Sequence, residues 1–303
     1  MRSTRSLLIV AAAVLWSTDT IFRLPLTQSF SAAAVVTVEH LLALGFVVPL
    51  LYRYRREVQS LTAGEWAGVA FVGAGASALA TLAFTASFSY ASPSVAILLQ
   101  KLQPIATFLL AAWVLHERLP RWFWALSAVA LGGAYLVSFP ELLPSLSVYR
   151  GGSTGPLLAL MAAALWGTAT VVGRRLLAKL PPDLVTALRF AAALPVLFAV
   201  LAFQGNLGEL GNLTTADLLR FVAILIGPGF GALFLYYRGL VATPASLATV
   251  LELAWPLSAV VINWLVLGQA LLPVQLVGGA VLVAAVTCLT LSRLTAARAT
   301  ATQ

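Results

Sequence analysis

The sequence predicts an all-α membrane protein of about ten transmembrane helices, arranged as two inverted five-helix repeats. Composition, the spacing of apolar runs and an internal repeat lead to this prediction. Of the 303 residues, 61% are hydrophobic and only 9% are charged, and the mean hydropathy is +0.97. A soluble domain has about 25% charged residues, so this chain has too few polar residues to cover a water-facing surface.

Apolar segments of membrane-spanning length follow one another along the whole chain. A bilayer core about 30 Å thick is crossed by a helix of about 20 apolar residues. Polar residues, prolines and glycines divide the chain into ten such segments. They are residues 6–24, 32–52, 65–89, 93–115, 121–139, 156–178, 182–203, 217–240, 243–267 and 272–291. The first begins like a signal peptide, but its place in the repeat described below predicts an uncleaved helix.

The distribution of lysine and arginine predicts the orientation. If the N-terminus is inside, the inner ends and loops carry most of the basic residues: Arg2, Arg5, Arg53, Arg55, Arg56, Arg118, Arg121, Arg174, Arg175, Lys179, Arg238, Arg293 and Arg298. The outer side carries only Arg23, Arg150 and Arg220. Cytoplasmic loops of membrane proteins are enriched in basic residues. We therefore expect a multi-pass protein of the cell (inner) membrane with both termini in the cytoplasm.

An internal repeat divides the chain in two. LWSTDT at 15–20 matches LWGTAT at 165–170, and Ala-Ser-Pro at 91–93 matches Ala-Thr-Pro at 242–244. LQKLQPIATFLLAAWVLHERL matches LELAWPLSAVVINWLVLGQAL, which aligns Pro104 with Pro256, and Val-Thr precedes both His40 and Arg189. We expect repeats at 1–150 and 151–303. Because each holds an odd number of helices, the second is inverted relative to the first, as in many secondary transporters.

These features resemble one known family, the EamA branch of the drug/metabolite transporter superfamily. The resemblance rests on five plus five spans, LW-[SG]-T near the start of each half, and a proline-centred helix ending in HERL or LGQAL. It implies ten helices around a central cavity and alternating access, often for export of metabolites or amino acids. The chain departs from the family pattern at HERL and GQAL, where a Gly-Glu pair is common, and at His40, where the usual arginine is found in the second half as Arg189.

Polar side chains next to the two prolines are candidates for a central substrate site. Lys101 and Glu252 lie shortly before Pro104 and Pro256, and intramembrane charges usually have a function. A proline leaves the carbonyl four residues earlier without its helical partner. We therefore expect both helices to kink and to present Lys101 and Glu252, with Gln100 and Gln103, to a cavity. Lys101 would bind a substrate anion and Glu252 an amine or a coupling proton; a structural ion pair is the alternative.

Three further residues are candidates for substrate binding. Trp16 and Trp166 occupy equivalent positions in the two halves and are expected to line the cavity, although packing is an equally ordinary role for tryptophan. Arg189 has a guanidinium group that can bind a carboxylate or phosphate with two hydrogen bonds. It could instead cap a helix–helix contact.

Glu39, His40 and Asp19 are candidates for proton coupling or gating. His40 is equivalent to Arg189, and a histidine titrates near neutral pH. A hydrogen-bonded histidine without a proton role is the alternative. Asp19 lies four residues before Arg23, which is the spacing of an intrahelical ion pair.

Other function classes have less support in the sequence. Neither a nucleophile–base pair nor a metal-ligand cluster appears, and the single Cys288 cannot form an internal disulfide. We expect no enzyme activity, no catalytic or metal site, no cofactor and no nucleic-acid partner. The expected partners are a small-molecule substrate and the lipid bilayer, and the expected state is a monomer or weak homodimer. A channel or a non-transporting membrane subunit remains an alternative.

The expected function is secondary active transport of small polar metabolites. Amino acids or related zwitterions are favoured because Lys101 and Glu252 have opposite charges. Organic anions, including phosphorylated metabolites, are the alternative, because Lys101 and Arg189 could bind them without Glu252.

Overall fold

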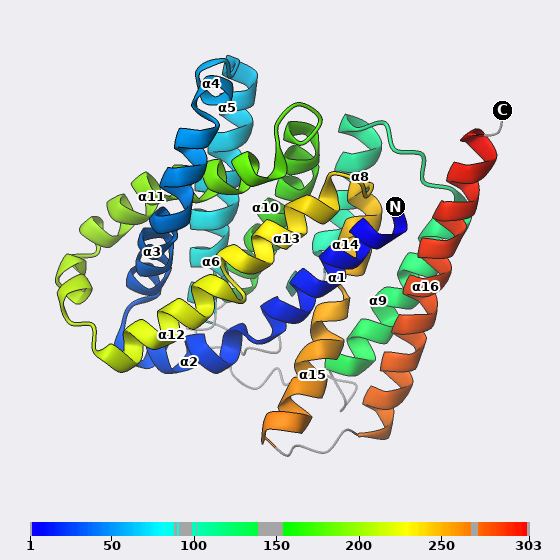
Figure 1. Ribbon diagram of the computed structural model, residues 1–303. Helices are drawn as coiled ribbons and strands as arrows, with labels where there is room; N and C mark the ends of the chain where they lie inside the picture. The colour runs from blue at the N-terminus through cyan, green and yellow to red at the C-terminus, as the bar shows by residue number, and fades with distance from the viewer. Residues whose placement is uncertain are drawn as a thin grey trace.

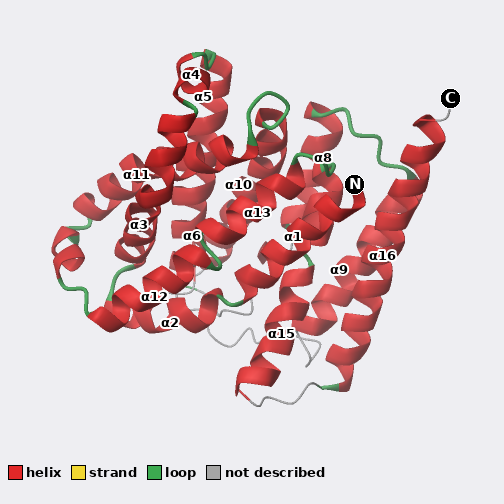
Figure 2. Ribbon diagram, viewed as in Figure 1, coloured by secondary structure: helices red, strands yellow, loops and turns green. Residues whose placement is uncertain are grey.

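The structure, a computed structural model, describes residues 2–87, 90, 99–100, 102–138, 154–267 and 272–301, and every regular element in these ranges is a helix (Figure 2). Six helices are long and apolar enough to cross a bilayer: Arg5–Ser29, Ala32–Arg53, Ala63–Ser87, Thr154–Leu176, Pro182–Phe203 and Thr215–Leu240. Four shorter apolar helices, Gln103–Val114, Arg121–Val137, Ala245–Ala259 and Pro273–Leu289, lie in the remaining predicted segments. The predicted fold class is confirmed.

Several of these spans are divided into shorter elements. The first half contains α1 (Arg2–Ser17), α2 (Asp19–Ser29), α3 (Ala32–Arg53), α4 (Arg55–Gln59), α5 (Ala63–Ala70), the π-helix η1 (Phe71–Leu79), α6 (Ala80–Ser87), α8 (Gln103–Val114) and α9 (Arg121–Ser138). The second half contains α10 (Thr154–Leu176), α11 (Pro182–Phe203), η2 (Leu207–Gly211), α12 (Thr215–Ile226), α13 (Phe230–Leu240), α14 (Ala245–Leu251), α15 (Ala254–Leu267) and α16 (Pro273–Ala301).

The third span of each half begins with the same local structure. Thr62 and Glu65 form a capping box at the start of α5, and Thr214 and Asp217 form one at the start of α12. In each box the threonine and the acidic side chain satisfy backbone N–H groups that the first turn of a helix leaves free. The two boxes are 214 − 62 = 152 residues apart, which is also the separation of Pro104 and Pro256.

The same span is interrupted at equivalent places. In the first half the α-helix gives way to the π-helix η1. In the second half, Gly227 and Gly229 flank Pro228 between α12 and α13, and the N–H of Ala232 donates to the carbonyl of Gly227 at 2.8 Å. Such interruptions of the regular hydrogen-bond ladder mark points at which helices bend.

The two halves exchange packing partners. The first span of one half lies against the third span of the other: α1 packs on α13, and α10 packs on α6 and η1. The second spans, α3 and α11, pack together, and the last spans, α9 and α16, run side by side (Figure 1). Because each half packs mainly on the other, the fold is a single interlocked unit.

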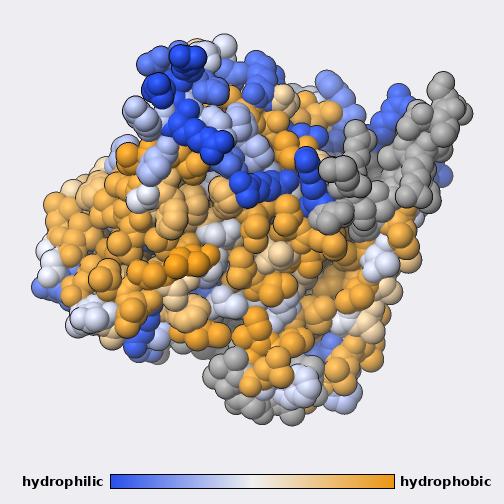
Figure 3. Space-filling model, in the orientation of Figure 1, coloured by the Kyte–Doolittle hydropathy of each residue, from blue (hydrophilic) through white to orange (hydrophobic). Residues whose placement is uncertain are grey.

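The surface agrees with burial in a bilayer. Apolar residues cover the broad middle of the face in Figure 3, whereas hydrophilic residues gather around α4 and α5. Exposed large apolar side chains include Leu7, Phe46, Val48, Trp113, Leu157 and Leu265. Hydrocarbon chains of lipid can cover such a surface without the hydration cost that water would impose.

Gly73 in η1 allows the closest approach between the third span and α11. A Cβ atom at this position would lie 2.5 Å from the Cβ of Ala192 and 2.8 Å from the carbonyl oxygen of Arg189. Any side chain would therefore push α11 away from η1. Small residues at helix crossings allow membrane helices to pack closely.

We predict that Gly73→Ala lowers the stability of the protein in detergent by about 1–3 kcal/mol, because overpacking a tight contact costs about that much. The measurement is the midpoint of thermal unfolding. Gly64→Ala is the matched control, because a Cβ at Gly64 meets no atom within 4 Å. Equal midpoints for Gly73→Ala and the wild type would contradict the close packing of η1 on α11.

Candidate functional site

A chain of hydrogen bonds between uncharged and acidic side chains crosses the boundary between the two repeats. The Nε2 of Gln100 donates to Oε1 of Gln103 at 3.1 Å, and the Nε2 of Gln103 donates to Oε2 of Glu252 at 3.0 Å. The hydroxyl of Tyr236 donates to Oε1 of Glu252 at 2.8 Å, and it lies 3.0 Å from the Oγ1 of Thr170. We call these five residues the central relay.

The relay gathers at points where helices begin, end or break. Gln103 is the first residue of α8, directly before Pro104, and Glu252 lies in the short break between α14 and α15. We expected the proline to leave the Glu252 carbonyl without a partner, and this expectation is wrong: the N–H of Trp255 donates to it at 3.0 Å. The tight turn at the break satisfies this group in place of the helical bond.

The carboxylate fixes the direction of the amide groups. An ionised carboxylate can only accept hydrogen bonds, so Gln103 must turn its NH₂ group toward Glu252 and its oxygen toward Gln100. Gln100 must then turn its own NH₂ group toward Gln103. Its Oε1 is left buried and accepts no hydrogen bond from a described residue. The relay therefore ends in a free acceptor.

Aromatic rings from both halves flank the relay. Trp16 lies 5.4 Å from Tyr236 between ring centroids, and Trp166 lies 5.3 Å from Phe84. Trp16 and Trp166 are 150 residues apart, and Phe84 and Tyr236 are 152 apart, so the repeat relates the two pairs. Trp166 also donates its Nε1–H to the carbonyl of Ala76 in η1 at 3.0 Å. Trp16 thus lies against Tyr236 of the relay, and the symmetry-related pair, Trp166 and Phe84, lies beside η1.

Lys101 lies outside the described residues. Glu252 forms no ion pair with any residue that the structure describes; its hydrogen-bond donors there are Gln103 and Tyr236. The strict repeat equivalent of Glu252 is Gln100, because 252 − 100 equals 256 − 104. Gln100 and Glu252 therefore belong to one relay, in which both bind Gln103.

Arg189 is buried beside the relay without a carboxylate partner. Its Nε donates to Oγ of Ser77 at 2.7 Å and its Nη1 donates to the hydroxyl of Tyr237 at 3.1 Å. The residue is 9% exposed, and no carboxylate of the described chain lies within ion-pair distance. Most buried charges in proteins are paired, so this arrangement leaves the guanidinium able to accept an anion.

His40 lies close to the same region from the other half. Its ring packs 4.7 Å from the ring of Phe190, the neighbour of Arg189, and its Nδ1 lies 2.8 Å from the carbonyl oxygen of Val36. The Nε2 is buried and has no partner among the described residues. The structure therefore brings the repeat-equivalent positions 40 and 189 to one helix interface, between α3 and α11.

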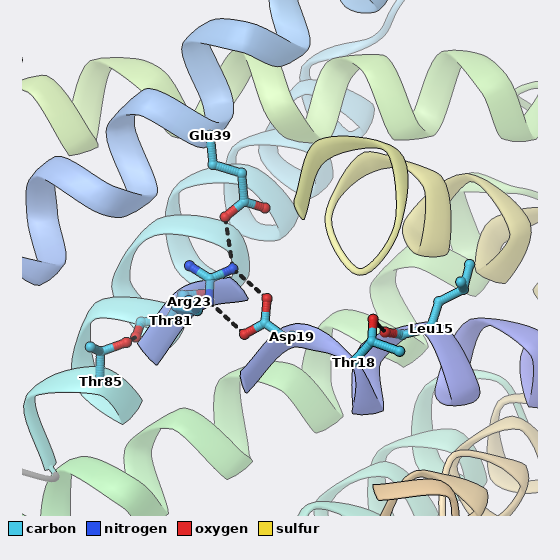
Figure 4. A network of polar contacts seen from close by, with 7 residues as sticks. All are labelled: Leu15, Thr18, Asp19, Arg23, Glu39, Thr81 and Thr85. Atoms are coloured by element: carbon cyan, nitrogen blue, oxygen red, sulfur yellow. Dashed lines mark hydrogen bonds and ion pairs between the residues drawn. The ribbon is translucent and has the colours of Figure 1, made fainter. Parts of the chain in front are cut away.

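Asp19, Arg23 and Glu39 form a separate cluster (Figure 4). Arg23 binds both oxygens of Asp19, at 2.5 and 2.9 Å, and its Nη2 also donates to Oε2 of Glu39 at 2.9 Å. The predicted intrahelical pair is thus formed, and Glu39 joins α3 to it. A Cβ atom at Gly229 would lie only 2.7 Å from Oε1 of Glu39, so the carboxylate also lies against the break between α12 and α13.

Sequence reasoning missed three residues with structural or relay roles. Tyr236 and Thr170 complete the relay, and both lie in helices whose apolar neighbours hide them. Glu117, in the HERL motif, caps the start of α14: it accepts hydrogen bonds from the N–H of Ala245 at 2.7 Å and the hydroxyl of Ser246 at 2.5 Å. The motif had drawn attention only as a departure from the family, because the helix that Glu117 caps begins 128 residues further along the chain.

Three of the five relay residues are buried in this conformation, and Gln100 and Glu252 are partly buried. Gln103, Tyr236 and Thr170 are each less than 8% exposed. Two open hollows on the described surface lie elsewhere, on the apolar outside. One is lined by Leu136, Pro273, Val274 and Val277, and the other by Pro195, Val196, Ala199, Val200 and Phe203.

Comparison with known proteins assigns the family. The sequence matches the EamA-like transporter family twice, over residues 4–139 and 153–291. It is 31% identical over 277 residues to the riboflavin transporter ImpX of Fusobacterium nucleatum, covering 89% of this chain and 92% of that protein. It is 29% identical over 167 residues to the uncharacterized transporter YwfM of Bacillus subtilis, covering 55% and 54%.

A solved crystal structure has the same fold. Its TM-score is 0.74 at 21% sequence identity, and the superposition covers 98% of this chain and 99% of the other. Together with the two family matches, one in each half, this agreement accounts for the duplicated helical architecture. The chain therefore belongs to the EamA-like transporter family and is a multi-pass secondary transporter of small molecules rather than an enzyme.

Proposed function

We propose that this protein transports a planar heteroaromatic solute, with riboflavin as the first candidate, through the centre of the two repeats. Transport would occur by alternating access, in a cell membrane with both termini in the cytoplasm. The observation that carries the proposal is a relay with Trp16 against one member, Tyr236, and with an acceptor on another, Gln100, that has no described partner, in a chain 31% identical to a riboflavin transporter over 89% of its length.

The chemistry of riboflavin suits this place. Its tricyclic ring system is flat, and one edge carries an imide N–H between two carbonyl groups. The free Oε1 of Gln100 could accept a hydrogen bond from that N–H, and Trp16 offers an aromatic face for stacking. Sites for small molecules commonly combine apolar walls with a few polar groups that fix orientation. Gln103, Tyr236 and Thr170 are buried here, whereas Gln100 and Glu252 are partly buried, so we expect full access to the relay to require another conformation.

Two other solute classes remain candidates. Arg189, buried with only hydroxyl partners, favours an organic anion. An amino acid or another zwitterion would need Glu252 to accept an ammonium group in place of Gln103 or Tyr236. The predicted partner charge for its carboxylate, Lys101, lies outside the described residues.

Purified protein in liposomes tests the proposal directly. Riboflavin uptake, measured by its fluorescence, should saturate and be inhibited by unlabelled flavins. A panel of radiolabelled amino acids and organic acids is measured in parallel. Saturable uptake of a panel member together with no uptake of riboflavin would replace riboflavin by that class.

We assign gating to the cluster of Asp19, Arg23 and Glu39, with His40 as a second candidate for proton handling. Arg23 links α2 to α3, and Glu39 touches the break between α12 and α13. A link between two moving segments stabilises one conformation over the other, so weakening it shifts their populations. The same cluster could serve only to hold helices together, and the Glu39→Gln variant separates these roles.

We predict that Gln100→Leu weakens riboflavin binding about tenfold, because a buried hydrogen bond lost on one side costs about 1–3 kcal/mol. The measurement is the quenching of flavin fluorescence on titration with protein. Gln204→Leu makes the same chemical change at the exposed end of α11 and should leave binding unchanged. Equal affinities of the two variants would remove Gln100 from the site.

We predict that Trp16→Ala weakens riboflavin binding by a similar factor, because a stacked aromatic pair contributes about 0.5–1.5 kcal/mol beyond the area it buries. Trp66→Ala, in the exposed part of α5, is the control. Both variants are titrated as above. A loss of affinity in the control alone would point to a site near the helix ends.

We predict that Glu39→Gln speeds riboflavin exchange about fivefold while its affinity stays unchanged, because a neutral acceptor replaces a charge-assisted bond worth about 1 kcal/mol more. Exchange is measured between equal riboflavin pools inside and outside liposomes. Glu57→Gln, on the exposed helix α4, is the control. An unchanged or slower rate, with a lower unfolding midpoint, would assign the cluster a packing role only.

A further inference from the structure

We propose that Glu252 binds the coupling proton and that the central relay makes this proton compete with the solute. The result would be an antiporter, in which a proton moving one way drives solute the other way. The inference rests on the proposed function for the identity of the solute, but the proton site itself can be tested without any solute.

The surroundings of Glu252 favour reversible protonation. Both of its oxygens accept hydrogen bonds, and both donors, Gln103 and Tyr236, are neutral. No cationic side chain of the described chain lies within ion-pair distance. Arg189 acts on Glu252 only at longer range. A partly buried carboxylate at membrane depth that has no counter-ion among the described residues is costly, so binding a proton relieves a cost that an ion pair would otherwise offset.

The relay can accommodate both protonation states without breaking. In the ionised state Gln103 and Tyr236 both donate to Glu252. If a proton joins Oε1, Glu252 can donate to the Tyr236 hydroxyl, which then donates to Oγ1 of Thr170 at 3.0 Å. Thr170 can in turn donate to the carbonyl of Trp166 at 3.4 Å. Each hydroxyl only rotates, so the heavy atoms stay in place.

If the proton joins Oε2 instead, the amides must turn over. Glu252 then donates to the oxygen of Gln103, and the NH₂ group of Gln103 turns toward Gln100. Gln100 must present its own oxygen to Gln103, so its NH₂ group takes the place of the free acceptor. An amide that turns by half a rotation exchanges oxygen and nitrogen at almost no change in shape. The relay thus converts one proton into a change from acceptor to donor at Gln100.

This change produces competition with the solute. The imide N–H of riboflavin pairs with the acceptor presented when Glu252 is ionised and faces a donor when Glu252 is protonated on Oε2. Linkage requires that a proton which weakens solute binding is itself bound less tightly when solute is present. The proton balance is simple: one proton passes from water to Oε2 and later returns to water on the other side, with no other bond or electron changed.

Within the described ranges, the other titratable and charged groups around Glu252 are few; Lys101 lies outside them. Helix α13 contributes Tyr236 and Tyr237, and α11 contributes Arg189, which holds Ser77 and Tyr237. His40, on α3, lies against Phe190 rather than in the relay. On α8, α10 and α1, the groups near the relay are Gln103, Thr170 and Trp16, none of which titrates near neutral pH. His40 is therefore the competing proton site.

Infrared difference spectroscopy of purified protein locates the proton. Acidification should produce C=O stretch bands of protonated carboxylic acids, and one component present in the wild type and in Glu57→Gln should be missing in Glu252→Gln. A difference spectrum of Glu252→Gln that keeps every wild-type component would overturn the assignment. This measurement needs no solute, so failure of riboflavin transport leaves it decisive.

Riboflavin binding at several pH values tests the competition. Wild-type affinity should rise about tenfold from acidic to alkaline pH, the size of one buried hydrogen bond gained. In Gln103→Leu, which cuts the relay, the remaining affinity should not depend on pH although the infrared band persists. In Glu252→Gln the pH dependence should also vanish. Its survival in both variants, or its loss in His40→Gln alone, would overturn the proposal.

Transport against a pH gradient tests coupling. In wild-type liposomes, riboflavin should accumulate on the acidic side above its equilibrium level, with alkalinisation of that side followed by a trapped pH dye. In Glu252→Gln, riboflavin accumulation should be the same with and without the pH gradient, whatever the residual transport rate of this variant. Riboflavin transport that ignores the gradient in the wild type would uphold the proposed function and reject the coupling. No riboflavin transport at all would reject the proposed solute, with the infrared result still deciding the proton site.

Discussion

The hydrogen bond between Gln103 and Glu252 joins the two repeats inside a medium that offers no water. Within a bilayer each polar group must find its partner in the protein. Gln103 begins one helix, Glu252 ends another, and each adds a partner from the opposite half to the one it has in its own. The exchange of packing partners between α1 and α13, and between α10 and α6, is the geometry that brings these two helix ends together.

The repeat carried most of what could be predicted from the chain. Apolar segments separated by polar residues, prolines and glycines predicted the ten spans, and the matched prolines and paired tryptophans of LW-[SG]-T predicted which positions lie at the centre. The relay partners were harder to predict because Tyr236 and Thr170 lie about 66 residues apart in sequence and meet only through packing between α10 and α13. One physical argument failed: a proline was expected to orphan the Glu252 carbonyl, but a tight turn lets the N–H of Trp255 reach it. Proline lacks the N–H group that would bind this carbonyl, but another backbone N–H group nearby can still bind it.

The two halves have also specialised at equivalent places. The third span bends through a π-helix in the first half and through Gly227-Pro228-Gly229 in the second. Position 40 is a histidine packed on Phe190, and its counterpart Arg189 binds Ser77 and Tyr237. The shared backbone plan places these side chains at the centre, and their differences give each half its own chemistry. The shared backbone arrangement therefore identifies the family, whereas the side chains at the centre determine the solute.

The equivalence of Gln100 and Glu252 bears on how such a protein could arise. Two identical copies of the first half, assembled antiparallel, would meet through two amides and have no titratable group at the centre. Two copies of the second half would set two carboxylates near one another, where like charges would oppose ionisation. Only a fused chain with unlike halves can keep a single carboxylate within a symmetric frame. After gene fusion, one of the two equivalent positions could change without the other. A symmetric scaffold could then acquire a single charged side chain.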